Sequence, residues 1–128
     1  MSKPAKPLSS LEQLIMQVLW RRGSATSEEV REALAKRHPM KQSTTRTLLV
    51  RLEEKGYAKH RVEGRTFVYS AAEPAANVAA RAIRHIVDRF CGGSVERLMV
   101  GMVDNEIVNQ DELEKLARKI KQRSRKGD

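Results

Sequence analysis

The spacing of apolar residues changes once within the first 70 residues, from a helical period to alternation. Up to residue 55 the apolar side chains recur every three or four positions, which is typical of amphipathic helices with one buried face. Between residues 57 and 70 the pattern alternates, and Phe67 and Tyr69 fall on one face, as in a half-buried strand. The sequence therefore predicts three short helices followed by a β-hairpin.

Local signals support the starts and ends of these helices. Ser9 with Glu12, and Thr26 with Glu29, have the spacing of a capping box, in which each side chain accepts a hydrogen bond from the other residue's backbone N–H. The first helix therefore begins at residue 9 or 10, and the second begins at Thr26. Gly23 ends the first helix, because glycine readily adopts the left-handed conformation found after helix ends.

The third helix and the hairpin follow directly. The helix covers residues 42–55, and two strands, 57–62 and 66–70, meet at a turn formed by Glu63 and Gly64. The core face of this helix consists of Thr45, Leu48, Leu49 and Leu52.

This order of elements is that of a winged helix-turn-helix. We expect a mainly α fold with a small β-hairpin wing over residues 9–72, preceded by a flexible tail over residues 1–8. In such a domain the third helix presents a free face to the major groove of DNA, while the hairpin reaches the phosphates. Hydroxyl and arginine side chains dominate these segments, and they donate to phosphates and base edges. The predicted DNA-binding residues are Lys41, Gln42, Ser43, Thr44, Thr45, Arg46, Thr47, Arg51, Arg61 and Arg65.

Residues 73–122 form a second region with helical periodicity, and residues 123–128 form a basic tail. Three amphipathic segments of this length are too few to build a core on one chain, so their apolar stripes indicate an interface. We expect a helical dimerisation arm, which favours a palindromic operator. The alternative is that the region packs back onto the N-terminal domain. The predicted dimer contacts are Val78, Ala82, Ile83, Ile86, Val87, Phe90, Leu98, Met102, Leu113, Leu116 and Ile120.

The charge balance favours a polyanionic partner. The chain has 25 Lys and Arg residues against 16 Asp and Glu, for a formal net charge of +9. Such a charge attracts nucleic acid first and anionic membrane surfaces second. Neither a secretory signal nor an apolar run of ~18 residues is present. We therefore expect a cytoplasmic protein without membrane insertion.

No group of residues in the sequence indicates catalysis or metal binding, so we expect neither enzymatic activity nor a cofactor. The sequence lacks a phosphate-binding glycine loop, a G-x-S-x-G turn and an H-E-x-x-H helix. Its three histidines fall in three different predicted elements. The single cysteine, Cys91, excludes an intramolecular disulfide. We interpret Cys91 as a packing residue, with a disulfide across a dimer left open.

Four stretches, which together span most of the chain, resemble a known protein family. They are LSSLEQLIMQVLW at 8–20, STTRTLLVRLEEKGY at 43–57, RTFVYSA at 65–71 and NQDELEKL at 109–116. These stretches resemble the penicillinase and methicillin-resistance repressors of the BlaI/MecI type. The resemblance implies a dimeric bacterial transcriptional repressor with an N-terminal winged helix and C-terminal helices that dimerise.

The resemblance also implies positions for the DNA contacts. The recognition helix corresponds to residues 42–55 and the wing to residues 59–68. The helix residues implied to face DNA are Thr44, Thr45, Arg46 and Thr47, and the implied wing contacts are Arg61 and Arg65.

The sequence departs from this family at two places. Family members often release DNA when a membrane sensor protease causes cleavage of the dimerisation arm, and the antibiotic-responsive members are cut at an Asn-Phe bond. Gly101-Met102 stands at that position here, so the sequence does not support a β-lactam signal. Gly101 still weakens the helix by roughly 1 kcal/mol relative to alanine, which favours protease access. A C-x-C pair is absent, which argues against the thiolate copper sensing of other members.

Three functions remain in competition on the sequence alone. The first is a sequence-specific repressor, the second is a basic architectural or non-specific nucleic-acid-binding protein, and the third is a winged-helix protein-interaction module. A steep loss of affinity with salt separates the first two from the third. Competition with random duplex separates the first from the second.

Overall fold

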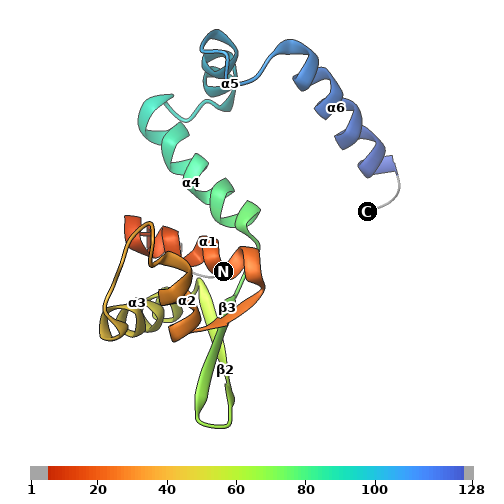
Figure 1. Ribbon diagram of the computed structural model, residues 1–128. Coiled ribbons are helices and arrows are strands. Elements are labelled where there is room, and N and C mark those ends of the chain that lie inside the picture. Colours follow the sequence, from red (N-terminus) through yellow and green to blue (C-terminus); the bar gives the residue numbers. More distant parts are fainter. Residues whose placement is uncertain (1–5, 126–128) are drawn as a thin grey trace. The chain divides into compact units, whose positions relative to one another are not determined.

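The computed structural model describes residues 6–125 of the chain (Figure 1), and these divide into two units on either side of the boundary between Ala82 and Ile83. The elements of the first unit are α1 (Ser10–Arg22), β1 (Ser24–Thr26), α2 (Ser27–Leu34), α3 (Gln42–Glu54), β2 (Ala58–Glu63), β3 (Thr66–Ala71) and the first half of α4 (Ala75–Phe90). The second unit holds the rest of α4 with α5 (Val95–Asp104) and α6 (Gln110–Arg125). The predicted mainly α fold with a small hairpin wing is confirmed.

Both predicted capping boxes form. The Ser9 hydroxyl accepts from the Glu12 N–H at 3.2 Å, and the Glu12 carboxylate accepts from the Ser9 N–H at 2.8 Å. Thr26 and Glu29 repeat this exchange at 3.1 and 2.8 Å. Gly23 follows α1 with φ of 88°, as predicted. Local hydrogen bonds thus set where α1 and α2 begin.

A three-stranded antiparallel sheet, in the order β1-β3-β2, replaces the predicted two-stranded hairpin. The sequence prediction missed β1, which is only three residues long and runs directly into α2. Figure 1 shows β2 and β3 extending beyond the helices as a narrow ribbon. This ribbon is the wing.

The wing turns one residue later than predicted. Glu63 pairs with Thr66, so Gly64 and Arg65 form the two-residue turn in place of Glu63 and Gly64. Gly64 has φ of 64°. A positive φ at the first turn position suits a type II′ hairpin and favours glycine there. Arg65 consequently stands at the tip of the wing.

The core of the first unit lies among α1, α2, α3 and the sheet. Its fully buried large side chains include Ile15, Leu19, Leu34, Leu49 and Leu52. Three helices and three strands thus contribute to one apolar cluster, which holds α3 with a single face against the domain.

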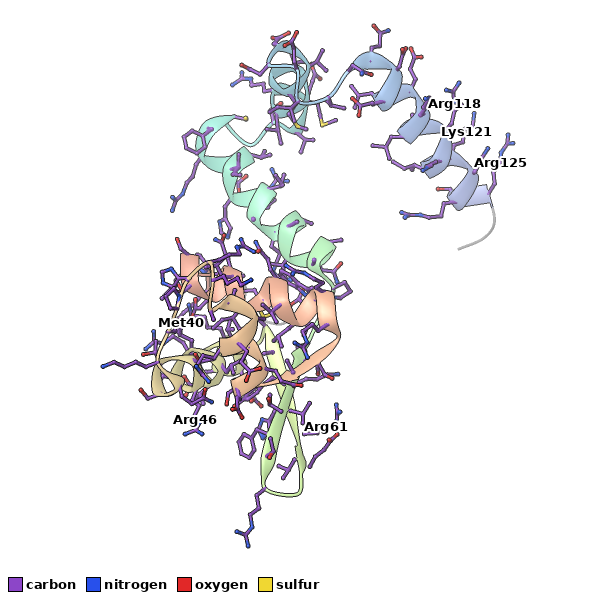
Figure 2. The ribbon with its side chains drawn as sticks, viewed as in Figure 1. Met40, Arg46, Arg61, Arg118, Lys121 and Arg125 are labelled. Atoms are coloured by element: carbon purple, nitrogen blue, oxygen red, sulfur yellow. The ribbon has the colours of Figure 1, made fainter. Side chains whose placement is uncertain are left out.

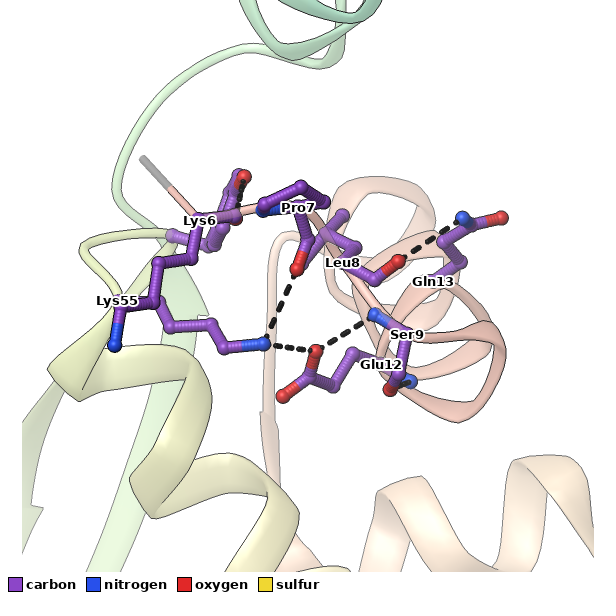
Figure 3. Close-up of polar contacts among 8 residues, drawn as sticks. Lys6, Pro7, Leu8, Ser9, Glu12, Gln13 and Lys55 are labelled. Atoms are coloured by element: carbon purple, nitrogen blue, oxygen red, sulfur yellow. Dashed lines mark hydrogen bonds and ion pairs between the residues drawn. The ribbon is translucent and has the colours of Figure 1, made fainter. Parts of the chain in front are cut away.

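Residues 6–8 are attached to the domain, so the predicted flexible tail is wrong for these positions (Figure 3). The Tyr57 hydroxyl donates to the Lys6 carbonyl, and the Lys55 ammonium donates to the Pro7 carbonyl at 3.2 Å. Leu8 packs against the core. Residues 1–5 of that predicted tail lie outside the described part of the chain.

A buried ion pair connects the start of α1 to the end of α3 (Figure 3). The Lys55 Nζ lies 2.7 Å from Oε1 of Glu12, which is fully buried. Burial raises the pKa of Glu12, but hydrogen bonds from Lys55 and the Ser9 N–H, together with the Lys55 charge, hold it below the ordinary value. Oε2 of Glu12 is buried without a hydrogen-bond partner. Lys55 and the Ser9 N–H therefore stabilise the negative charge of Glu12.

The first turns of α4 belong to the winged-helix unit. The Trp20 indole N–H donates to the Glu73 carbonyl at 3.1 Å. The Glu73 carboxylate accepts two hydrogen bonds from Arg81, at 2.7 and 2.8 Å, and they lower its pKa. Val78 packs against the core cluster.

The second unit has little interior. Among the described residues, α5 and α6 bury no side chain and α4 buries only Val87. Ser94 caps α5, and Asn109 with Glu112 forms a reciprocal cap on α6.

The last helix is longer than predicted. It continues to Arg125, beyond the predicted end of the helical region at residue 122. Residues 126–128 of the predicted basic tail lie outside the described residues. No helix within residues 6–125 has the length and apolar character needed to cross a membrane.

Candidate nucleic-acid interface

The two faces of α3 differ sharply in exposure. Leu48, Leu49 and Leu52 pack into the core, and this packing leaves Arg46 and Thr47 on the exposed face. Figure 2 shows Arg46 extending from α3 on the side toward which the wing projects. The free face of the helix and the wing can therefore approach one ligand together.

Thr45 does not lie on that exposed face. Its side chain is fully buried, and its hydroxyl donates to the Lys41 carbonyl at 3.1 Å. The assignment of Thr45 as a DNA contact is therefore wrong, while its assignment to the core face is confirmed. The helical period explains this, because Thr45 is in line with Leu48, Leu49 and Leu52.

Gln42 is held by the protein itself. Its side-chain oxygen accepts from Arg31 Nε at 2.8 Å, and its amide nitrogen donates to the Ser27 hydroxyl at 2.7 Å. Both partners lie on α2, so Gln42 fixes the start of α3 to that helix. The sequence pattern gave no signal for this role.

The start of α3 is open to an anion. The N-cap residue, Lys41, makes no side-chain capping bond, and the first turn contains no acidic residue. Lys41, Ser43 and Thr44 are exposed. The first backbone N–H groups of a helix and its dipole favour negative charge, which suits a phosphate at this end.

Two shallow hollows lie along the exposed face of α3. One is lined by Arg46, Thr47, Val50, Arg51 and Glu54, and the other by Ser43, Thr44, Thr47, Leu48 and Arg51. Val50 and Glu54 were not among the predicted contacts. Their positions, seven residues after Ser43 and Thr47 respectively, place them on the same helix face, so the helical period could have identified them.

The wing carries exposed cations. Arg61 pairs with Glu63 at 2.6 Å, and both side chains are more than half exposed. Such an exposed pair is weak, so Arg61 can exchange it for a phosphate. Arg65 is exposed at the turn. Figure 2 shows Arg61 projecting from the side of the ribbon.

A histidine joins α3 to the wing. His60 Nδ1 lies 2.6 Å from Oε1 of Glu53, near the end of α3. The His60 ring stacks on Phe67, with centroids 4.2 Å apart and 12° between the planes, and Tyr69 packs beside it. Burial raises the pKa of Tyr69, and the Glu53 charge raises it further. These contacts set the position of the wing relative to α3.

The predicted dimer contacts fall into three groups. Val87 is fully buried within its own chain, which argues against its assignment as a dimer contact. Val78 is half-buried and packs on the core of its own domain. The apolar stripe of α4 is continuous, while its surroundings differ along the helix. Leu98, Met102 and Leu113 are half-buried. The exposed members are Ala82, Ile83, Ile86, Phe90, Leu116 and Ile120.

The second unit exposes further apolar residues that were not among the predicted dimer contacts. They are Val95, Val100, Val103 and Ile107, with exposed fractions from 37 to 69%. Phe90, at 80%, is the most exposed large apolar side chain within the described residues. An apolar surface of this extent on one short region is characteristic of an interface.

The chain matches characterised repressors in sequence. A sequence profile described as "Penicillinase repressor" matches residues 8–122. The penicillinase repressor of Bacillus licheniformis is 27% identical over 114 residues, which cover 89% of both chains. The methicillin resistance regulatory protein MecI of Staphylococcus aureus (strain N315) is 24% identical over 109 residues, which cover 85% of this chain and 89% of MecI.

Two solved structures match the first unit. The solution structure of the DNA-binding domain of the repressor BlaI has a TM-score of 0.52. The monomeric form of Bacillus licheniformis BlaI, solved in complex with the blaP half-operator, has a TM-score of 0.50. Both are 33% identical and cover 59% of this chain and 93% of their own. A winged helix with a free, cationic α3 face and a match over residues 8–122 identify the chain as a member of the penicillinase repressor family of transcriptional repressors.

Proposed function

We propose that this repressor binds a palindromic operator as a homodimer, through α3 and the wing of each protomer. The observation that carries this proposal is the exposed face of α3. It combines an open helix start with hydroxyl groups and two arginines, Arg46 and Arg51, and the wing lies beside it. A helix of this kind fits the major groove.

The contacts divide into two chemical roles. Arg46 lies on the exposed face of α3, where a guanidinium can bind the O6 and N7 atoms of guanine. The N–H groups at the start of α3 and the side chains of Arg61 and Arg65 suit phosphate oxygens. Phosphate contacts fix the position of the domain on the duplex, while the α3 contacts read the sequence.

The second unit supports dimerisation. It buries only Val87 within the described residues, and this is too little apolar burial to offset the entropy of ordering three helical segments. A second copy that covers the exposed side chains of α4, α5 and α6 supplies the missing interior. Two-fold symmetry then places two α3 helices on successive turns of the duplex, ~34–36 Å apart or a multiple of that spacing.

Relief of repression by proteolysis belongs to the same proposal. Gly101 and Met102 are half-buried within α5. A glycine inside a helix lowers its local stability, and local opening is what a protease requires. A membrane sensor protease is the partner that the family resemblance implies. Induced cells that contain only intact repressor would contradict this part of the proposal.

Footprinting of the full-length protein on promoter DNA around its own gene tests the proposal. With random duplex as competitor, we expect a protected palindrome and a steep loss of affinity with salt. Uniform weak coverage that the competitor removes would instead indicate a basic architectural protein. Binding that is insensitive to salt would indicate a protein-interaction module. DNA as the ligand also implies action in the cytoplasm of a bacterium.

A further inference from the structure

Val50 occupies the middle of the exposed α3 face. Its side chain is 47% exposed, and it lines a hollow with Arg46, Thr47 and Arg51. Leu49 and Leu52 of the same helix pack into the core, and Val50 lies on the exposed face instead. Of the five residues that line this hollow, Val50 is the only apolar one.

The chemistry of this position excludes most ligands. An isopropyl group can neither donate nor accept a hydrogen bond, so Val50 cannot contact a phosphate or the polar edge of a base. The Thr47 hydroxyl already donates to the Ser43 carbonyl at 3.0 Å, which occupies its hydrogen. The hollow therefore presents one apolar side chain in a lining that also holds two arginines, Arg46 and Arg51, and one glutamate, Glu54.

The major groove contains one apolar group that matches this surface. The four bases present only donors and acceptors there, except for the C5-methyl group of thymine. The flanking arginines favour a polyanion over an apolar protein surface, which supports DNA as the occupant. We propose that Val50 is a specificity-determining residue that contacts the C5-methyl group of one thymine in each half-site. This inference rests on the proposed operator binding.

Replacement of thymine by deoxyuridine tests this contact, because it removes the methyl group and leaves base pairing intact. The probe is the duplex that the full-length protein enriches from a random-sequence library, with each thymine replaced in turn. We expect one position per half-site at which the wild type loses about fourfold in affinity, since burial of one methyl group contributes about 0.8 kcal/mol. In Val50→Ala the same replacement has no effect.

A matched variant separates the methyl contact from general effects of valine truncation. Val62 is an equally apolar residue that is 57% exposed on β2. Val62→Ala therefore retains the loss of affinity on deoxyuridine substitution. Val50→Ala keeps the fold, because the residue is exposed and alanine has the higher helix propensity.

The outcomes distinguish this inference from the function on which it rests. Failure to enrich any duplex would overturn operator binding itself. Equal affinity of the wild type for every thymine and deoxyuridine duplex would overturn the role of Val50 and leave operator binding intact. A loss on deoxyuridine substitution that persists in Val50→Ala would assign the methyl group to another residue and would also overturn the inference.

Discussion

The two units of this repressor differ in how they obtain an interior. Among the described residues, fourteen of the fifteen buried apolar side chains lie in the first unit, and only Val87 lies in the second. The helices of both units are amphipathic, so amphipathicity does not explain the difference. The first unit folds its helices around a sheet and covers its own apolar faces. The second unit leaves its apolar faces exposed, and the proposed dimer would couple its stability to association.

Truncation of a core residue gives the largest effect and sharpens this contrast. Leu49 is fully buried in the first unit. Leu49→Ala is expected to lower the free energy of unfolding by about 2–5 kcal/mol, independently of protein concentration. Thermal and urea denaturation measure this loss. Leu116→Ala, at a half-exposed position on α6, is the matched truncation, and its effect should vary with protein concentration.

A charge placed on the apolar stripe of α6 tests the second unit directly. Ile120→Arg is expected to weaken dimerisation roughly 100-fold, about 2.8 kcal/mol, because an unpaired charge would be buried at the interface. Gln122→Arg adds the same charge on the opposite side of α6 and should leave the dimer intact. Sedimentation of Ile120→Arg at the wild-type rate across micromolar concentrations would refute an α6 interface.

Removal of the cation that pairs with Glu12 tests how the first unit holds α3. Lys55→Met leaves a buried carboxylate without its partner and is expected to cost roughly 1–3 kcal/mol at neutral pH. The pKa of Glu12 in the folded protein is lowered from its ordinary value of 4.5, so the ion pair stabilises the wild type above pH 4.5. This stabilisation is lost as the pH falls through the pKa that Glu12 has in the folded protein. The difference in the free energy of unfolding between the wild type and Lys55→Met should therefore narrow as the pH is lowered from 7 to 3. Denaturation of both proteins at each pH measures it. Lys36→Met, at an exposed position, is the control.

Arg46→Ala is expected to reduce discrimination between the operator and a duplex altered at one base pair by about 1–3 kcal/mol. Its affinity for random duplex should change much less, because the guanidinium reads a base. Competition binding with single-base operator variants measures this difference. An equal loss on every duplex would assign Arg46 to a phosphate.

Arg65→Ala is expected to have the smallest effect. A phosphate contact at the tip of the wing carries no sequence information, so all duplexes should be weakened alike. The slope of log affinity against log salt should fall by about 0.9. An unchanged slope would show that the wing tip does not touch the backbone.

Local chemistry explains which parts of this fold could be predicted from sequence. The caps at Ser9 and Thr26 involve residues three positions apart, and both were predicted correctly. The hairpin turn was misplaced by one residue, because the pairing of Glu63 with Thr66 sets the register and is not visible in the local sequence. The strand β1 exists only because β3 pairs with it.

Residues of the candidate site could be predicted only where the helical period decides which side chains are exposed. The helical period separates Arg46 and Thr47 from Leu48 and Leu49, and the structure has the same division. Sequence reasoning did not detect that the Gln42 side chain hydrogen-bonds to α2, because its partners are eleven or more positions away in the sequence. The α4 stripe likewise gave no sign that Val78 packs on its own domain.

Trp20 gives the chain an intrinsic optical probe. It is the single tryptophan, and its indole N–H donates to the Glu73 carbonyl immediately before α4 begins. Indole emission responds to hydrogen bonding and to the polarity of its surroundings. The wavelength of maximum emission therefore reports on the segment that connects the wing to α4. A change in the structure of this junction can therefore be followed without any attached dye.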